Sequence, residues 1–171
     1  MLVPSWGGRF AATVAAWLYV DSVREMEIIA ALFMDDIELR SVPGPSTRID
    51  LGGIQFSAPA PAPPPVSVAP HLVVLVWNPP TGNEFGALEV TFDFYAPDVD
   101  TAAETVDASD GNGHEPLARN VQPLQIEPGK FNYRLVRADL EFDDYKTVIA
   151  TCRIDGGRPH VVPYTLLPPV Q

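Results

Sequence analysis

The chain has 171 residues, a formal net charge of −11 and a pI of about 4.5. Such an acidic surface repels phosphate groups, so we expect neither nucleic acid nor an anionic membrane surface as a partner. With 46% hydrophobic and 19% charged residues, the chain is too apolar for a wholly disordered protein and long enough to bury one core.

Residues 1–25 differ in composition from the rest of the chain. The apolar run Phe10–Val20 is shorter than the roughly 20 residues that cross a bilayer. Trp17 and Tyr19 stand where a signal peptide has small residues before its cleavage site. We therefore interpret this segment as an extension outside the core, either upstream of a true start at Met26 or a poorly packed helix. A signal or anchor segment, which would make the protein secreted, and a helix that covers a sheet edge are the alternatives.

The domain proper, residues 26–171, is predicted to consist of short strands. Glu27–Met34 is an apolar run, and its short length and isoleucines favour a strand over a helix. Thr47–Ser57 alternates between apolar and polar residues, and its apolar phase shifts at Gly52 and Gly53. A glycine pair within a strand predicts a β-bulge, after which the strand continues.

The segment Ala58–Pro70 is dominated by proline. Because proline donates no backbone hydrogen bond, the segment is predicted to be an extended polyproline II crossover between two sheets, without ladder pairing. A ligand for an aromatic groove is the alternative, which is disfavoured because no Lys or Arg accompanies the prolines.

Two apolar runs are predicted to form the centre of the core. Leu72–Trp77 is apolar on both sides, as expected for a strand near the middle of a sheet. Leu88–Phe94 alternates between apolar and polar residues, which predicts a strand with one buried face. Turn residues separate the two runs, so we predict a β-hairpin over Pro70–Pro97.

Further strands follow an acidic loop at residues 97–116. Pro116–Ile126 contains Pro123, which favours a position at a sheet edge. Within Phe131–Phe142 the apolar phase switches, which predicts a bulge at Leu135–Val136.

The last two strands, Tyr145–Ile154 and Pro159–Leu167, flank a glycine-containing hairpin turn at residues 155–158. About eight or nine short strands with turn signals between them predict an all-β fold. We expect a two-sheet antiparallel β-sandwich of immunoglobulin-like or C2-like type, with Greek-key connections.

This order of strands and glycines resembles a family of short bacterial proteins with a domain of unknown function. In that family an apolar strand ending near an Asp precedes a Gly-Gly strand, a hairpin rich in glycine and aromatic residues, and a final apolar strand. The matching pieces are Ala31–Asp35, Leu51–Ile54, Gly129–Leu135 and Cys152–Tyr164. The resemblance covers the chain from Met26 to about Leu167. It implies a compact β-sandwich and no particular activity.

Acidic residues in the stretch 93–115 are the candidates for a metal site. They are Asp93, Asp98, Asp100, Asp107 and Asp110. A calcium loop has glycine at its sixth position and glutamate at its twelfth, where the loop that starts at Asp107 has Asn112 and Ala118. Because this pattern is incomplete, we expect a solvated loop and no cofactor. A module that binds Ca²⁺ or carbohydrate through residues 93–115 is the alternative function.

No catalytic motif is present in the sequence. His71, His114 and His160 lack metal-ligand spacing, and no nucleophile-elbow or phosphate-binding glycine pattern occurs. The single cysteine, Cys152, shares the apolar phase of its strand, which predicts a buried, inert thiol. One cysteine can form no disulfide within the chain, which fits a cytoplasmic protein. We expect no enzyme; a hydrolase of unrecognised type would need one of the histidines beside two carboxylates.

Aromatic side chains are the candidates for recognition, provided that they face outward. They are Trp77, Tyr95, Tyr133, Tyr145 and Tyr164, of which Tyr95 is the first choice because it lies on the polar phase of its strand. The expected function is that of a non-enzymatic structural or protein-interaction module with another protein as its partner. The sequence leaves the oligomeric state open.

Overall fold

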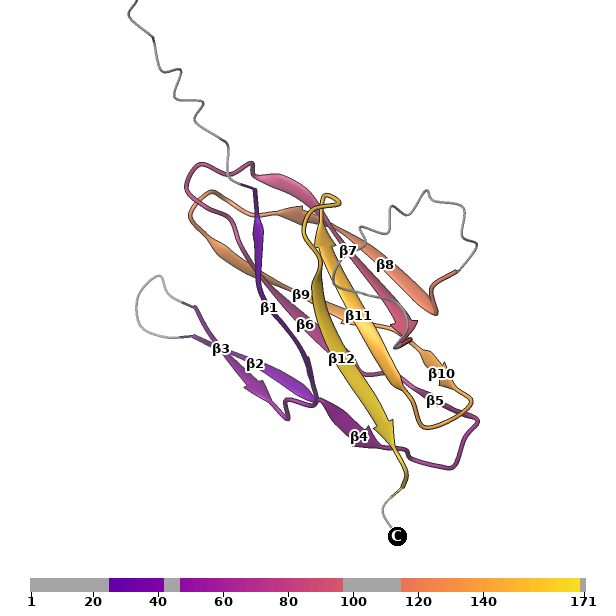
Figure 1. The fold of residues 1–171 in the computed structure, drawn as a ribbon. Helices are drawn as coiled ribbons and strands as arrows, with labels where there is room; N and C mark the ends of the chain where they lie inside the picture. The colour runs from indigo at the N-terminus through magenta and orange to yellow at the C-terminus, as the bar shows by residue number, and fades with distance from the viewer. Residues whose placement is uncertain (1–24, 42–46, 97–114, 170–171) are drawn as a thin grey trace, which may run out of the picture.

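The computed structural model describes residues 25–41, 47–96 and 115–169, which form an all-β structure without a helix (Figure 1). Its strands are β1 (Glu27–Met34), β2 (Asp36–Ser41), β3 (Thr47–Gly52), β4 (Ser57–Pro59), β5 (Val66–Val68), β6 (His71–Trp77), β7 (Phe85–Phe94), β8 (Ala118–Gln125), β9 (Phe131–Arg137), β10 (Leu140–Phe142), β11 (Thr147–Ile154) and β12 (His160–Leu167). Residues 1–24 of the predicted extension and 97–114 of the acidic loop lie outside the described ranges.

The strands form four sheets. The small sheet has the order β1-β6-β9, the large sheet has the order β4-β12-β11-β7-β8, and β2 with β3 and β5 with β10 form two further ladders. Among the described strands, pairing is antiparallel except between β4 and β12. Figure 1 shows the small and large sheets lying over one another, with the hairpin of β2 and β3 projecting beside β1.

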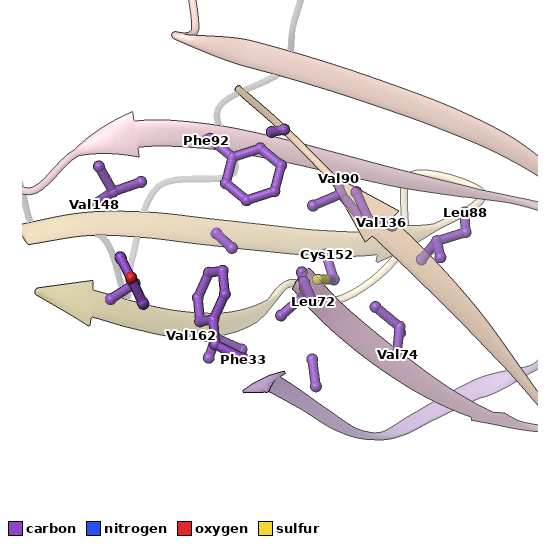
Figure 2. Packing of buried hydrophobic residues seen from close by; sticks show 14 of the residues in the cluster. Phe33, Leu72, Val74, Leu88, Val90, Phe92, Val136, Val148, Cys152 and Val162 are labelled. Atoms are coloured by element: carbon purple, nitrogen blue, oxygen red, sulfur yellow. The ribbon is translucent and has the colours of Figure 1, made fainter. Parts of the chain in front are cut away.

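The small and large sheets share one hydrophobic cluster. The small sheet contributes alternate residues such as Phe33 and Leu72, and the large sheet contributes Phe92 and Val148. All four are at most 1% exposed, and Figure 2 shows such side chains converging between the ribbons. Burial of a side chain of this size stabilises the fold by roughly 1.5–3 kcal/mol. The arrangement is compatible with the expected sandwich, and the predicted core row of β7 is confirmed.

The predicted hairpin over Pro70–Pro97 is wrong. β6 pairs with β1 and β9, whereas β7 pairs with β11 and β8, so the two strands belong to different sheets. Both strands nevertheless direct apolar side chains into the shared cluster. Two apolar runs around a turn are equally typical of a hairpin and of an arch that crosses from one sheet to the other. Pairing partners far along the chain decide between the two.

Asn78 fixes the arch between β6 and β7. Its side chain is fully buried, and its Nδ2 donates hydrogen bonds to the carbonyl oxygens of Asn83, at 2.8 Å, and Ile126, at 2.6 Å. Its backbone N–H donates to the carbonyl of Lys130 at 2.9 Å, and its own carbonyl accepts from the N–H of Gly129 at 2.8 Å. One asparagine therefore joins the arch to the turn between β8 and β9.

The chain after β1 also differs from the prediction. A strand that the sequence analysis did not include, β2, begins at Asp36 and pairs with β3. Gly52 ends β3, and Gly53 has a φ of 61°, so the glycine pair closes the root of a hairpin instead of forming a bulge. A side chain at Gly53 would be strained in this left-handed conformation and would overlap the side chain of Asp35.

The proline-rich segment crosses from the large sheet toward the small sheet, as predicted. The prediction that it makes no ladder pairing is wrong, because β4 runs along β12 and β5 pairs with β10. Pairing is confined to Ser57–Pro59 and Val66–Val68, near the ends of the segment, where residues other than proline supply N–H groups.

β9 is regular where a bulge was predicted. Leu135 pairs with Val73 and Val136 pairs with Leu72, without a shift in register. The strand instead ends at Arg137, and β10 begins at Leu140. The phase switches in the sequence because β9 carries apolar side chains on both of its faces.

Two other predictions are confirmed. β8, which contains Pro123, lies at the edge of the large sheet. β11 and β12 form a hairpin in which Asp155 and Gly156 have φ values of 48° and 71°, as a tight turn with positive φ requires.

Candidate functional site

Of the predicted site residues, the structure describes Asp93 and Tyr95. Asp93 is half-buried near the end of β7, opposite Ile149. Tyr95 is 51% exposed just after β7, and its backbone N–H donates to the carbonyl of Thr147. The remaining candidates, Asp98, Asp100, Asp107 and Asp110, lie outside the described residues. Binding of Ca²⁺ or carbohydrate at residues 93–115 therefore stays a prediction.

Within the described ranges, no group of three or more His, Cys, Asp or Glu side chains is placed to hold a metal ion. An open cleft of about 1020 Å³ lies between the start of β1 and the turn that connects β11 to β12. It is lined by His160, Glu25 and Glu27, the kind of set that a hydrolase would need. No hydrogen bond or ion pair of the described chain joins this histidine to either carboxylate, and no serine or cysteine lines the cleft. The cleft therefore offers no nucleophile held by a base.

Cys152 is fully buried in the cluster, as predicted. Burial raises the pKa of its thiol from an ordinary 9.0 to about 12. The pKa is raised only in the folded state, so the contribution of this thiol to the free energy of unfolding is complete below pH 9.0. It is lost as the pH rises toward 12, because the unfolded chain then releases the thiol proton more readily than the folded one. We expect Ellman's reagent to leave native protein unmodified at neutral pH and to titrate the thiol fully in denaturant. Rapid modification of the native protein would contradict the buried position.

The small sheet has a second apolar face, which points away from the cluster. On β6, residues that alternate with the cluster members Leu72, Val74 and Val76 must point to the opposite side of the sheet. Their neighbours on β1 and β9 are apolar as well. We call this surface the outer face, and it consists of Leu32, Val73, Leu75, Trp77, Phe131, Tyr133 and Leu135.

The outer face is most open along β9. Phe131 is 69% exposed and Leu135 is 43% exposed. The ring of Phe131 stacks on that of Trp77, with centroids 6.2 Å apart and an interplanar angle of 27°. Val73, at the centre, is fully buried between its cross-strand partners Leu32 and Leu135. Aromatic side chains can each bury roughly 150–250 Å², so this surface holds apolar area that folding alone leaves in water.

β9 shows the reverse of the pattern expected for an edge strand. Its cluster-side positions include Asn132, opposite Val76, and Arg134, opposite Val74. The guanidinium of Arg134 donates to the carbonyl of Pro123 on β8, which links the edges of the two sheets. A strand selected only for folding would place its apolar row inward, because alternation assigns each row to one face. The outward apolar row of β9 therefore makes the outer face the candidate interaction surface.

The outer side of the large sheet provides an internal comparison. There Glu89 and Thr91 of β7 lie beside Arg153 and Thr151 of β11, and Arg119 Nε contacts Glu89 Oε1 at 2.6 Å. The same side of the large sheet also carries the exposed apolar residues Phe85, Val121 and Val161, but there they alternate with charged and polar partners. The outer face of the small sheet differs in that its apolar residues are cross-strand neighbours of one another.

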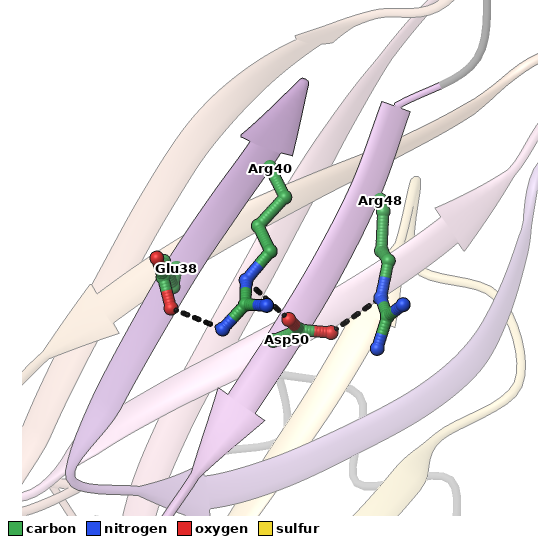
Figure 3. Close-up of polar contacts among 4 residues, drawn as sticks. All are labelled: Glu38, Arg40, Arg48 and Asp50. Carbon is green, nitrogen blue, oxygen red and sulfur yellow. Dashed lines mark hydrogen bonds and ion pairs between the residues drawn. The ribbon is translucent and has the colours of Figure 1, made fainter. Parts of the chain in front are cut away.

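The hairpin of β2 and β3 is the second unusual surface, and we call it the arm. Arg40 contacts Glu38 at 3.0 Å and Asp50 at 2.8 Å, and Arg48 contacts the other oxygen of Asp50 at 2.8 Å (Figure 3). Two arginines and two carboxylates cancel in charge, so this network provides no free cationic patch for phosphate. Exposed ion pairs of this kind are worth at most about 1 kcal/mol each.

Sequence reasoning found part of the outer face and missed the rest. Trp77 and Tyr133 are among the predicted aromatic candidates, whereas Phe131 and Leu135 are not, and a bulge was predicted in their strand at Leu135–Val136. Tyr164, another candidate, is buried with its ring 4.9 Å from that of Phe33, so it does not meet the condition of facing outward. The available signal was the polar pair Asn132 and Arg134 between the apolar residues of β9, which reverses the usual assignment of faces.

Comparison with protein-family models and with curated proteins found no significant match for this chain. The resemblance to a bacterial family therefore stays a prediction. Within the described part of the chain, no helix has the length and apolarity needed to cross a bilayer.

Proposed function

We propose that this chain is a non-enzymatic, cytoplasmic protein-interaction module that binds a protein partner through the outer face of the small sheet. The observation that carries the proposal is the stack of the exposed Phe131 on Trp77. It belongs to an apolar surface on β9, whose apolar row points away from the cluster. Exposed apolar patches of this kind, particularly with aromatic residues, are typical of interfaces between proteins.

The shape and charge of the molecule favour a protein over other ligands. The outer face is the surface of a sheet, whereas sites for small molecules are concave. The net charge of −11 disfavours a polyanion. A single, fully buried thiol supports a reducing compartment such as the cytoplasm.

The proposal is tested by placing a photo-crosslinking amino acid, benzoylphenylalanine, at position 131 in cells. We expect a crosslinked adduct with a protein that mass spectrometry identifies and that binds the purified module. Because a charge would have to be buried at the interface, Phe131→Glu should weaken binding by at least about tenfold, or about 1.4 kcal/mol.

Phe85 provides the matched control. It is also a phenylalanine, it is 68% exposed, and it belongs to β7 of the large sheet. The same crosslinker at position 85 should give no adduct, and Phe85→Glu should leave binding unchanged. Adducts of equal yield from both positions, or none from position 131, would overturn the proposed function.

A further inference from the structure

The outer face of the small sheet ends in a basic pair of residues. His71 begins β6 and Arg137 ends β9, and the two are cross-strand partners. Both residues are exposed. Their chain neighbours Leu72 and Val136 belong to the hydrophobic cluster, so alternation directs His71 and Arg137 to the outer face.

The outward residues of β9 form the accessible part of this face. Phe131, Leu135 and Arg137 are exposed, whereas Val73 at the centre of the face is fully buried. A protein partner therefore contacts the face along β9. We call Phe131, Tyr133, Leu135 and Arg137 the β9 row, which is apolar or aromatic along its length and cationic at its end.

Arg137 differs from most cationic residues of the described chain because its side chain has no partner there. The guanidinium of Arg137 makes no hydrogen bond or ion pair with any residue that the structure describes. The cationic side chains that do form ion pairs or donate to backbone carbonyls are those of Arg40, Arg48, Arg119, Arg134, Lys146 and Arg153.

The small sheet offers Arg137 no carboxylate nearby. Although the chain contains 22 acidic and 11 basic residues, Glu27 is the only acidic residue in the three strands of this sheet. Glu27 pairs with Trp77, at the other end of β6 from the partner of Arg137. The length of β6 separates the two charges by roughly 20 Å, so the cation at the end of the β9 row is left for a partner.

We propose that Arg137 determines the specificity of the outer face by pairing with an aspartate or glutamate carboxylate that the protein partner presents beside an apolar segment. This inference rests on the proposed function and names the chemistry of the partner. The planar guanidinium matches a carboxylate through two parallel N–H···O bonds, and arginine is enriched at the energetically important positions of interfaces. A partner without the carboxylate would bury the guanidinium unpaired, which disfavours its binding.

A carboxylate fits this position better than a phosphate group on the partner. Surfaces that bind phosphorylated segments usually cluster several arginines. The one other arginine in the three strands of the small sheet, Arg134, lies on the cluster side of β9 and donates to the carbonyl of Pro123. The net charge of −11 also repels a dianion more strongly than a monoanion.

The test uses the full chain with benzoylphenylalanine at position 131, and the yield of the crosslinked adduct in cells is measured. Arg137→Glu should lower this yield at least about tenfold, because two carboxylates then face each other across the interface. Arg158→Glu is the matched control. Arg158 is also exposed and makes no hydrogen bond or ion pair with a described residue, but it lies between β11 and β12. Its substitution should leave the yield unchanged.

The partner identified from the adduct is then purified, and its dissociation constant is measured at about 50 mM and about 500 mM NaCl. Salt should weaken binding of the unmodified chain several-fold by screening the ion pair, and should weaken binding of Arg137→Gln much less. Equal effects of Arg137→Glu and Arg158→Glu, equal salt dependence of the unmodified chain and Arg137→Gln, or loss of binding after phosphatase treatment of the partner would each overturn the inference. The proposed function survives these three results, whereas both fail if position 131 gives no adduct.

Discussion

Replacement of Phe92 by alanine is expected to lower the free energy of unfolding by about 3–5 kcal/mol. Phe92 is 1% exposed and belongs to the cluster between the small and large sheets. Its cross-strand partners on β8 and β11 are Ala118 and Ala150, so the ring fills the space that two small side chains leave. Because backbone pairing holds these neighbours in place, we expect the cavity to collapse little. Equilibrium denaturation in urea measures the loss.

Phe85 controls for the change of residue type on the same strand. Since Phe85 is 68% exposed, Phe85→Ala should alter the free energy of unfolding by no more than about 0.5 kcal/mol. Similar losses for the two variants would show that β7 does not direct Phe92 into a shared core, and the assignment of faces would have to be revised.

Asn78→Asp is expected to destabilise the protein by at least about 3 kcal/mol at neutral pH. The substitution keeps the size of the side chain but removes the donor that serves the carbonyls of Asn83 and Ile126. It also places a buried negative charge against two carbonyl oxygens. Protonation removes that charge, so the deficit relative to the unmodified protein should be smaller near pH 4 than near pH 8. Thermal and urea denaturation at the two pH values measure the difference.

Asn83→Asp is the matched substitution for this experiment. Asn83 is exposed and accepts the bond from Asn78 through its backbone carbonyl, which the substitution retains. We expect a change within about 0.5 kcal/mol. A loss from Asn78→Asp that is equally small, or one that does not depend on pH, would contradict the role of Asn78 as the link between the arch and the turn.

Local alternation predicted most of the strands but not how they pair. The period-two pattern of β7 and the glycines between β11 and β12 act over a few residues, and both predictions are confirmed. The choice between a hairpin and an arch after Trp77 depends on β1 and β9, which lie far along the chain in opposite directions. The same holds for Gly53, whose carbonyl accepts a hydrogen bond from the backbone N–H of Asp35. Residues distant in sequence supply these constraints.

The outer face could not be predicted from the sequence of β9 alone. Alternation defines two rows on β9 but does not state which row meets the core. The predicted bulge at Leu135–Val136 was the explanation for finding apolar residues in both rows of this strand. Val136 pairs with Leu72, and both belong to the hydrophobic cluster. The alternate residues of β9, which include Phe131, must therefore point outward. A strand with apolar residues on both faces is thus a sequence signal for a sheet whose second face is a candidate interaction surface.

The most direct test of the outer face is hydroxyl-radical footprinting of Trp77, Phe131 and Tyr133, with Phe85 as the reference. In dilute purified protein we expect Phe131 to be oxidised about as readily as Phe85, because the two are 69% and 68% exposed. In extract from the source cells, the three outer-face residues should be protected several-fold, while Phe85 stays unchanged. Equal oxidation under all conditions, or protection of Phe131 already in dilute monomer, would contradict the claim that this face binds a protein partner.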